Sequence, residues 1–253
     1  MQVSIFITCL IDTMFPDVAE SLVRLLQRQG IQVQVPRGQT CCGQPAFNSG
    51  YWEEAREVAK TWINAFSDSD YIVSPSGSCG AMIHHNYPML FKDDPKRLAL
   101  IEKLKARTFD WTQFFVDILQ VEDLGASANV RATYHPSCHA TRLLELHNAP
   151  QRLLQHVRGL TLVDLPFAEQ CCGFGGTFSV KVPAISTAMA TDKVTHIAKT
   201  QAQVVLGLDM GCLMNIAGRM KHMQMEIPTM HLAQFLDRAT SGVPILEKAG
   251  DRI

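Results

Sequence analysis

The sequence lacks several features that point to common functions. Among its 253 residues there is no G-x-x-x-x-G-K-[ST] motif, which argues against nucleotide hydrolysis. Its 23 basic and 24 acidic side chains nearly balance, so we expect no surface for nucleic acid. No apolar run reaches the ~18 residues of a transmembrane helix, and the first residues lack the basic start of a signal peptide. We therefore expect a cytoplasmic protein that reaches the inner membrane, if at all, only as a peripheral component through its partners.

The eight cysteines lack the spacing of small zinc modules. No two of them form the Cys-x-x-Cys knuckle from which such modules are typically built. With nothing to direct export, structural disulfides are disfavoured, because cytosolic thiols stay reduced. Adjacent cysteines could in any case bridge each other only through a strained ring. Metal binding or redox chemistry is therefore the better explanation for this many cysteines.

The cysteines form an internal repeat. Each half of the chain has a single cysteine, then an adjacent pair followed by glycine, then one more cysteine. We call these groups the first cysteine set, Cys9, Cys41, Cys42 and Cys79, and the second cysteine set, Cys138, Cys171, Cys172 and Cys212. A single buried cysteine is an ordinary small hydrophobe, but that interpretation does not account for a duplicated pattern of four. The repeat predicts two equivalent sites.

Short apolar runs alternate with helical patterns in both halves. Residues 31–35 alternate in polarity and stop at Pro36, as a strand does, and 160–165 is the matching run in the second half. Residues 17–28 and 51–66 carry apolar side chains at helical spacing, and 185–199 is the matching helix of the second half. These patterns predict an α/β fold of two tandem pseudo-symmetric modules, each a parallel or mixed sheet flanked by helices.

The two modules are expected to meet in the small and polar segment 121–129. This places the first module over residues 1–124 and the second over 125–253. The cysteines then follow the carboxyl ends of strands, where open α/β sheets have their ligand sites. Three loops in each half could thus bring residues more than 70 positions apart to one centre.

Four thiolates suit either zinc or an iron–sulfur cluster. Adjacent cysteines place two sulfurs on neighbouring backbone units, where they could ligate different irons of one cluster. The glycine after each pair, Gly43 or Gly173, leaves room for a bulky inorganic centre and permits a positive φ. In the second copy the turn 173–177 could aim backbone N–H groups at cluster sulfides, although its glycines also fit an ordinary flexible turn.

On these residues the chain resembles the cysteine-rich CCG domain family, which includes the cysteine-rich component of heterodisulfide reductase, the iron–sulfur subunit of glycolate oxidase and the lactate-utilization protein A group. Segments 171–179 and 75–80 are most similar to the lactate-utilization group, and the match covers nearly the whole chain. The resemblance implies an iron–sulfur electron-transfer subunit of a multi-subunit system that oxidises L-lactate or a related 2-hydroxy acid such as glycolate. Such an oxidoreductase subunit would not be active alone.

The chain departs from the fullest family motif, in which each module ends in Cys-x-x-Cys and has five cysteines. Ser76 stands three residues before Cys79, and Asp209 three before Cys212. Four thiolates fit a [4Fe–4S] cubane, so we expect one or two such clusters per chain, held by both cysteine sets. Asp209 could add an oxygen ligand to iron. The ferredoxin-type C-x₂-C-x₂-C-x₃-C-P run is also missing, so at least one partner subunit of the complex must carry such clusters.

Histidines near the cysteines offer further contacts. His135 and His139 flank Cys138, and we expect them to make hydrogen bonds to cluster sulfurs. The adjacent His84 and His85 are more typical of a surface. Two other functions stay open, a thiol–disulfide reductase subunit of the heterodisulfide type and a zinc-stabilised binding module, with zinc in one of the two modules. The sequence identifies no catalytic residue.

Overall fold

The computed structural model describes residues 1–146 and 148–246, and its strands and helices alternate along the chain. The strands are β1 (Gln2–Ile5), β2 (Gln32–Gln34), β3 (Ile72–Ser74), β4 (Thr108–Asp110), β5 (Ser127–His135), β6 (Arg158–Val163), β7 (Val204–Gly207) and β8 (Thr229–His231). The helices of the first half are α1 (Cys9–Met14), α2 (Pro16–Arg28), α3 (Gln44–Asn48), α4 (Trp52–Phe66), α5 (Gly77–Ala81), α6 (Tyr87–Leu90), α7 (Pro95–Lys105) and α8 (Trp111–Gln113), with π-helical turns η1 (Met82–Asn86) and η2 (Phe114–Ile118). Those of the second half are α9 (Cys138–Arg142), α10 (Ala149–Gln155), α11 (Thr177–Lys181), α12 (Pro183–Lys199), α13 (Met210–His222) and α14 (Leu232–Ser241).

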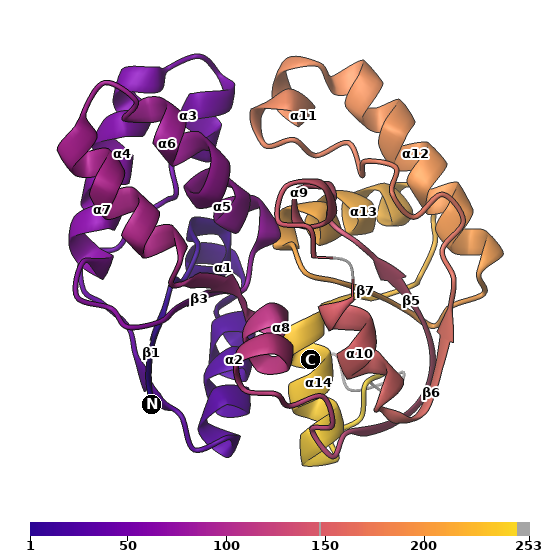
Figure 1. Ribbon diagram of the computed structural model, residues 1–253. Coiled ribbons are helices and arrows are strands. Elements are labelled where there is room, and N and C mark those ends of the chain that lie inside the picture. Colours follow the sequence, from indigo (N-terminus) through magenta and orange to yellow (C-terminus); the bar gives the residue numbers. More distant parts are fainter. Residues whose placement is uncertain (147, 247–253) are drawn as a thin grey trace.

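The strands form two four-stranded sheets, one in each lobe of Figure 1. The strand order is β2-β1-β3-β4 in the first sheet and β6-β5-β7-β8 in the second, and all pairs are parallel. When the strands of the two halves are matched in chain order, β1 with β5 through to β4 with β8, the two sheets have the same strand order. The predicted α/β class and the pseudo-symmetry of the two modules are therefore confirmed, and the sheets are parallel rather than mixed.

The amphipathic segments form helices close to where the sequence predicts them. Helix α2 begins with Pro16 at its first position and buries an apolar stripe that includes Leu22 and Leu26. It ends before Gly30, whose φ of +71° turns the chain toward β2. The other two predicted helices, over residues 51–66 and 185–199, correspond to α4 and α12.

Each sheet has a fourth strand that the sequence patterns do not predict. Strands β4 and β8 have three residues each, too few to show an alternating pattern. Both end in a residue that caps the next helix, Asp110 at α8 and His231 at α14. Strand β5 begins at Ser127, inside the segment expected to join the modules, because Ser127 pairs with Arg158 of β6.

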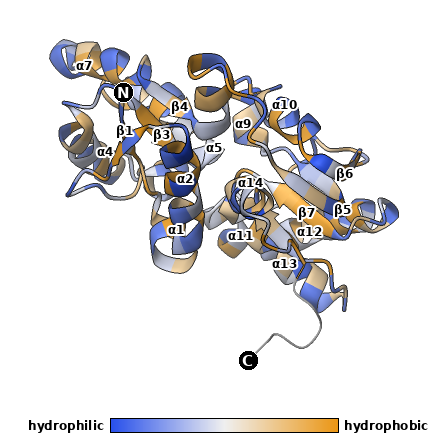
Figure 2. Cartoon of the chain, turned by 90° about the horizontal axis from the view of Figure 1, so that it is seen from below, coloured by the Kyte–Doolittle hydropathy of each residue, from blue (hydrophilic) through white to orange (hydrophobic). Residues whose placement is uncertain are grey.

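The two lobes share one hydrophobic core. Leu22 of α2, Val3 of β1, Val204 of β7 and Phe235 of α14 are all completely buried in it. The outer face of each sheet has a separate core, which includes Trp62 in the first lobe and other apolar side chains in the second. Figure 2 shows hydrophobic strands such as β3 and β7 lying between helices with hydrophilic outer faces. The shared core holds the two sheets in a defined relation.

Helices from opposite halves meet between the lobes. Helix α2 lies beside α14 near the centre of Figure 1. Above them α5 packs on α9, so closely that a Cβ at Gly77 would lie 2.7 Å from the Cβ of Ala140. Because α5 carries Cys79 and α9 begins at Cys138, this close packing brings the two cysteine sets toward each other. Within the part of the chain that the structure describes, no helix is long and apolar enough to cross a membrane.

Candidate metal centre

The first cysteine set lines one cavity at the carboxyl end of the first sheet. Cys9 begins α1 just after β1, Cys79 lies in α5 after β3, and the pair Cys41 and Cys42 precedes α3. All four side chains line a cavity of about 150 Å³. The Sγ atoms of Cys9 and Cys41 are 3.7 Å apart. Residues separated by up to 70 positions thus meet at one point, as the spacing predicts.

The second cysteine set meets in the same way in the other lobe. Cys138 begins α9 after β5, Cys212 lies in α13 after β7, and the pair Cys171 and Cys172 precedes α11. These four side chains line a smaller cavity of about 60 Å³. The Sγ atoms of Cys172 and Cys212 and a ring nitrogen of His135 all lie within 4.8 Å of one another. Binding of iron by either set stays a prediction.

Burial of the thiols follows the same pattern in both sets. The second cysteine of each pair and the last cysteine of each set are buried, whereas the other two are more accessible. All eight are free thiols, as expected for cysteines that do not form structural disulfides. Each set therefore presents an inner and an outer pair of sulfurs to its cavity.

A tight turn positions each Cys-Cys-Gly segment. Gly43 and Gly173 have φ values of +86° and +85°, a conformation that side chains other than glycine's rarely adopt. In this conformation each glycine N–H lies 3.4 Å from the Sγ of Cys41 or Cys171 and donates to it. A Cβ at Gly173 would also lie 2.6 Å from the carbonyl oxygen of Ser186. Glycine is therefore required both by the backbone angle and by the packing of the turn on its helix.

A side chain that follows the last cysteine anchors each pair from behind. In the first lobe the hydroxyl of Tyr87 donates to the carbonyl oxygen of Cys42 at 3.0 Å. In the second lobe Nδ2 of Asn215 donates to the carbonyl oxygen of Cys172 at 2.8 Å. These bonds connect the loop that carries the pair to the helical segment after the last cysteine, and so preorganise the set.

Neither set favours four negative charges by itself. Hydrogen bonds from Cys42 and Cys9 lower the pKa of Cys41 well below its usual range, and at Cys171 the strongest such bond comes from Cys138. The pKa of each donor thiol rises, because its proton is shared with the neighbouring sulfur and burial disfavours a further charge. Four thiolates can coexist in such a cavity when a metal centre supplies the compensating positive charge.

The two cavities are neighbours and share part of their lining. The residues common to both are Gln44, Ser78, Phe174, Gly176 and Asp209. Some of these belong to the first lobe and some to the second. Each cysteine set is therefore completed by side chains from the opposite lobe, which the internal repeat alone does not predict.

Asp209 joins the two lobes between the cavities. Its Oδ1 accepts from the backbone N–H of Gly211 at 3.1 Å and so caps α13. Its Oδ2 accepts from the hydroxyl of Ser76 at 3.2 Å and from the N–H of Ser78 at 3.0 Å. The two residues at the missing cysteine positions of the family motif thus bond to each other. Ligation of iron by Asp209 stays a prediction beside this structural role.

The histidines occupy different environments. His135 is 1% exposed, and neither of its ring nitrogens has a partner within the described residues. The Nδ1 of His139 is 3.6 Å from the Sγ of Cys138. His84 and His85 bond to the backbone carbonyls of Thr108 and Leu143, and neither lines a cysteine cavity. His135 and His139 are thus close to thiols, and their hydrogen bonds to cluster sulfurs stay a prediction.

The sequence analysis missed Lys193. This side chain on α12 is completely buried beside the second cysteine set, and its Nζ donates to the carbonyl oxygens of Phe167 and Ala168, each at 3.0 Å. A signal for it exists in the sequence, because residue 193 lies within the apolar stripe of Ala190 and Ile197. A lysine at such a core position is rarely buried without a specific partner.

Comparison with known proteins shows what the chain is similar to. The model of a family described as the cysteine-rich domain, CCG, matches residues 3–84 and 132–217. The chain is 53% identical over 237 residues to Lactate utilization protein A of Geobacillus kaustophilus, covering 94% of this chain and 99% of the relative. It is 48% identical over 237 residues to the protein of the same name in Bacillus subtilis, again covering 94% of this chain and 99% of the relative. A solved glutamate racemase from Bacillus anthracis aligns over 96% of this chain and 80% of its own, at 11% identity and a TM-score of 0.37, too low to inform function.

Proposed function

This chain belongs to the cysteine-rich CCG domain family, and we propose that it is the iron–sulfur electron-transfer subunit of a multi-subunit system that oxidises L-lactate or a related 2-hydroxy acid. The observation that carries the proposal is the meeting of four thiols in each lobe, at the carboxyl end of a parallel sheet. The name shared by its relatives, Lactate utilization protein A, supports the substrate class. An association with the cytoplasmic side of the inner membrane, through partners, belongs to the same proposal.

In number, the four thiols of each cavity fit one [4Fe–4S] cluster, although the Sγ atoms of Cys9 and Cys41, 3.7 Å apart, would have to separate to reach different irons. Each cluster needs four thiolates, and each lobe offers four, provided by loops that bonds from Tyr87 and Asn215 hold in place. When bound, such a cluster takes up and releases electrons one at a time. The chain's own residues bind it, donate backbone hydrogen bonds to its thiolates from Gly43 and Gly173, and exclude water from the inner sulfurs.

The organic oxidation belongs to partner subunits. The chain has no nucleotide-binding signature and no ferredoxin-type cysteine run, so its centres need other redox groups to exchange electrons with. We propose that at least one partner carries ferredoxin-type clusters. Within this chain, the module over residues 1–124 would hold one centre and the module over 125–253 the other.

Metal and sulfide analysis of protein purified without oxygen tests this proposal. Wild-type chain from iron-replete cells should be brown and contain about four iron and about four sulfide for each intact site. Cys42→Ser should remove the centre of the first lobe, and Cys172→Ser that of the second, each leaving the other centre as its internal control. Stoichiometric zinc without sulfide would contradict the proposal. Dye reduction with L-lactate by the purified single chain, at a normal enzymatic rate, would contradict the need for partners.

One observation favours zinc as the alternative for the first lobe. The Sγ atoms of Cys9 and Cys41 are 3.7 Å apart. Two thiolates on one tetrahedral ion with bonds of about 2.3 Å lie about 3.8 Å apart, which is nearly the same separation. A zinc-stabilised module would keep its fold but transfer no electrons. The same analysis decides between the two, because zinc would then replace iron in that lobe and no sulfide would accompany it.

A further inference from the structure

The two cysteine sets have different surroundings, although the lobes follow one plan. The residue three positions before the first cysteine is Phe6 in the first lobe and His135 in the second. Phe6 directly follows β1, and His135 is the last residue of β5. Both are almost completely buried, with exposed fractions of 0% and 1%. The same structural position therefore holds a hydrocarbon ring in one lobe and an imidazole in the other.

A second pair of equivalent positions also has an aromatic ring in the first lobe and a nitrogen-bearing polar side chain in the second. The glycine after each cysteine pair packs against Ala55 of α4 in the first lobe and Ser186 of α12 in the second, so these residues match. Seven residues later, on the same helix face, stand Trp62 and Lys193, both completely buried. In the first lobe the rings of Phe6 and Trp62 pack edge to face, with centroids 5.9 Å apart. In the second lobe a lysine replaces that tryptophan.

The polar groups of the second lobe have unused hydrogen-bonding capacity. Neither nitrogen of His135 has a partner within the described residues, although a buried N–H is costly to leave unpaired. One of these nitrogens lies within 4.8 Å of the Sγ atoms of Cys172 and Cys212. A group bound between those sulfurs would be in a position to supply the partner that this imidazole lacks. Lys193 uses two of its three donors on carbonyl oxygens of the loop before the cysteine pair.

The two cysteine sets also differ in the charged side chains near them. Among the residues that the structure describes, no lysine or arginine lines either cavity directly, so the difference lies in the layer of residues behind the cysteines. In the second lobe Lys193 lies close enough to interact electrostatically with all four cysteines of the set, and burial lowers its pKa while those thiols oppose the shift. The carboxylate of Asp209 lines both cavities and so does not distinguish them.

We propose that the two centres are electronically inequivalent, and that the second, bordered by His135 and Lys193, has the more positive reduction potential. The inference rests on the proposed function, since it concerns the same two sites. A cluster held by four thiolates is anionic, and each added electron increases its negative charge. A buried cation and a buried N–H donor stabilise that added charge in a medium of low dielectric constant. At equilibrium, an electron that a partner's redox centre gives to this chain therefore resides mainly on the second centre.

A redox titration of the full chain, followed by electron paramagnetic resonance, tests this inference. Cys42→Ser and Cys172→Ser each remove one centre and so assign the two signals of the wild type. Lys193→Gln retains a donor for the loop carbonyls but removes the charge. It should lower the equilibrium constant for reduction of the second centre at least tenfold, which is about 59 mV for one electron. His135→Phe, the residue of the first lobe, should shift the potential in the same direction.

Two variants serve as controls. Lys199→Gln makes the same charge change at an exposed position of the same helix and should leave both potentials unchanged. Lys193→Arg keeps the charge and should keep the wild-type potential. Equal or reversed potentials in the wild type would overturn the inference, as would a shift in Lys193→Gln no larger than in Lys199→Gln. If Lys193→Gln failed to hold the second centre, the order of the two potentials in the wild type would test the inference. A more positive second centre would support it, and equal or reversed potentials would overturn it.

The outcomes separate this inference from the proposed function. Two clusters with the same potential would overturn the inference and leave the electron-transfer role intact. Protein without iron and sulfide would overturn both.

Discussion

Among the individual residues, Asp110 at the end of β4 shows how burial changes the chemistry of a side chain. Its Oδ1 accepts from the backbone N–H and the hydroxyl of Thr112, at 2.8 and 2.6 Å. Its Oδ2 has no partner within the described residues, and the residue is 4% exposed. Burial, only partly offset by the bonds from Thr112, raises the pKa of this carboxyl from 3.8 to about 6.

The pH dependence of stability should reveal this carboxyl. Between its unfolded pKa near 3.8 and its folded pKa of about 6, the native state binds the proton more tightly than the unfolded state. The contribution of Asp110 to stability should therefore fall as the pH rises through this window, by up to about 3 kcal/mol in total, and stay level above it. The buried His231, whose pKa is lowered, contributes in the opposite direction in both wild type and variant. In Asp110→Asn this loss should be absent, as measured by urea unfolding under reducing conditions at pH 4 to 8.

Asp68→Asn, at an exposed position on the same lobe, is the control and should keep the wild-type slope. An Asp110→Asn variant whose stability changes with pH in the same way as that of the wild type would contradict this prediction.

At the scale of elements, the Cys-Cys-Gly turn and the helix beneath it act as one unit. The turn of the second lobe packs more tightly, because a Cβ at Gly173 would lie 2.6 Å from a backbone oxygen of α12, whereas at Gly43 the nearest atom would be 3.2 Å away. Gly125, with φ of +67°, has open space around it. These glycines separate the effect of the backbone angle from that of the packing.

The three alanine variants should therefore lose stability to different extents. Gly125→Ala should lose only about 1 kcal/mol of unfolding free energy, because its side chain is placed at a positive φ without a clash. Gly173→Ala must also move α12 away, so we expect a total loss of about 2–4 kcal/mol and reduced metal content of the second site. Gly43→Ala should lie between them. Thermal unfolding and iron analysis check the order, and a Gly173→Ala variant no less stable than Gly125→Ala would refute it.

The junction of β8 and α14 links elements from both lobes through one side chain. Nδ1 of His231 accepts from the N–H of Ala233 and caps α14, which fixes the tautomer with hydrogen on Nε2. That Nε2 then donates to the carbonyl oxygens of Pro75 and Leu208, at 2.9 and 3.1 Å. Burial lowers the pKa of His231 and keeps the ring neutral. A single histidine thus connects the segments that lead to the last cysteine of each set.

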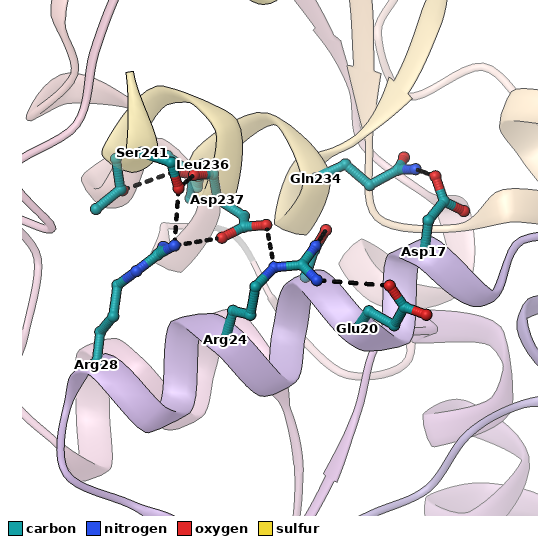
Figure 3. Close-up of polar contacts among 10 residues, drawn as sticks. Asp17, Glu20, Arg24, Arg28, Gln234, Leu236, Asp237 and Ser241 are labelled. Atoms are coloured by element: carbon teal, nitrogen blue, oxygen red, sulfur yellow. Dashed lines mark hydrogen bonds and ion pairs between the residues drawn. The ribbon is translucent and has the colours of Figure 1, made fainter. Parts of the chain in front are cut away.

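At the scale of the whole molecule, α2 and α14 connect the two ends of the chain. Figure 3 shows Asp237 of α14 between Arg24 and Arg28 of α2, with both ion pairs at 2.8 Å. The Asp237 side chain is 7% exposed, whereas those of the two arginines are 46% and 34% exposed. The carboxylate is therefore the buried partner on which this interface depends.

Removing that carboxylate should loosen the contact between the lobes. Asp237→Ala leaves two guanidinium groups without their partner, and because both are partly solvated we expect a loss of about 1–2 kcal/mol. Glu20→Ala removes an exposed carboxylate 3.5 Å from the same Arg24 and should cost less than about 0.5 kcal/mol. Urea unfolding measures both, and equal losses in the two variants would show that the interface does not depend on Asp237.

Local and repeated patterns can be predicted from the amino-acid sequence. Helices α2 and α4 were predictable because each has a long amphipathic stripe, and a periodicity of 3.6 residues is visible without knowledge of any neighbour. Helix α12 was predictable because it repeats the position of α4 in the second half. The meeting of each cysteine set was predictable because one spacing occurs twice in an α/β pattern, and parallel strands end at one edge of their sheet. The module boundary, the bound metal and the ligands remain predictions.

The arrangement of the two halves around their sites follows from tertiary packing, which no local pattern predicts. Strands β4 and β8 escaped prediction because three residues show no period, and they form by pairing with β3 and β7. The shared lining of the cavities and the bond between Ser76 and Asp209 depend on α5 packing against α9. Lys193 is buried beside the second set because α12 turns its apolar stripe toward that sheet. Such contacts join residues far apart in the chain, and packing alone selects them.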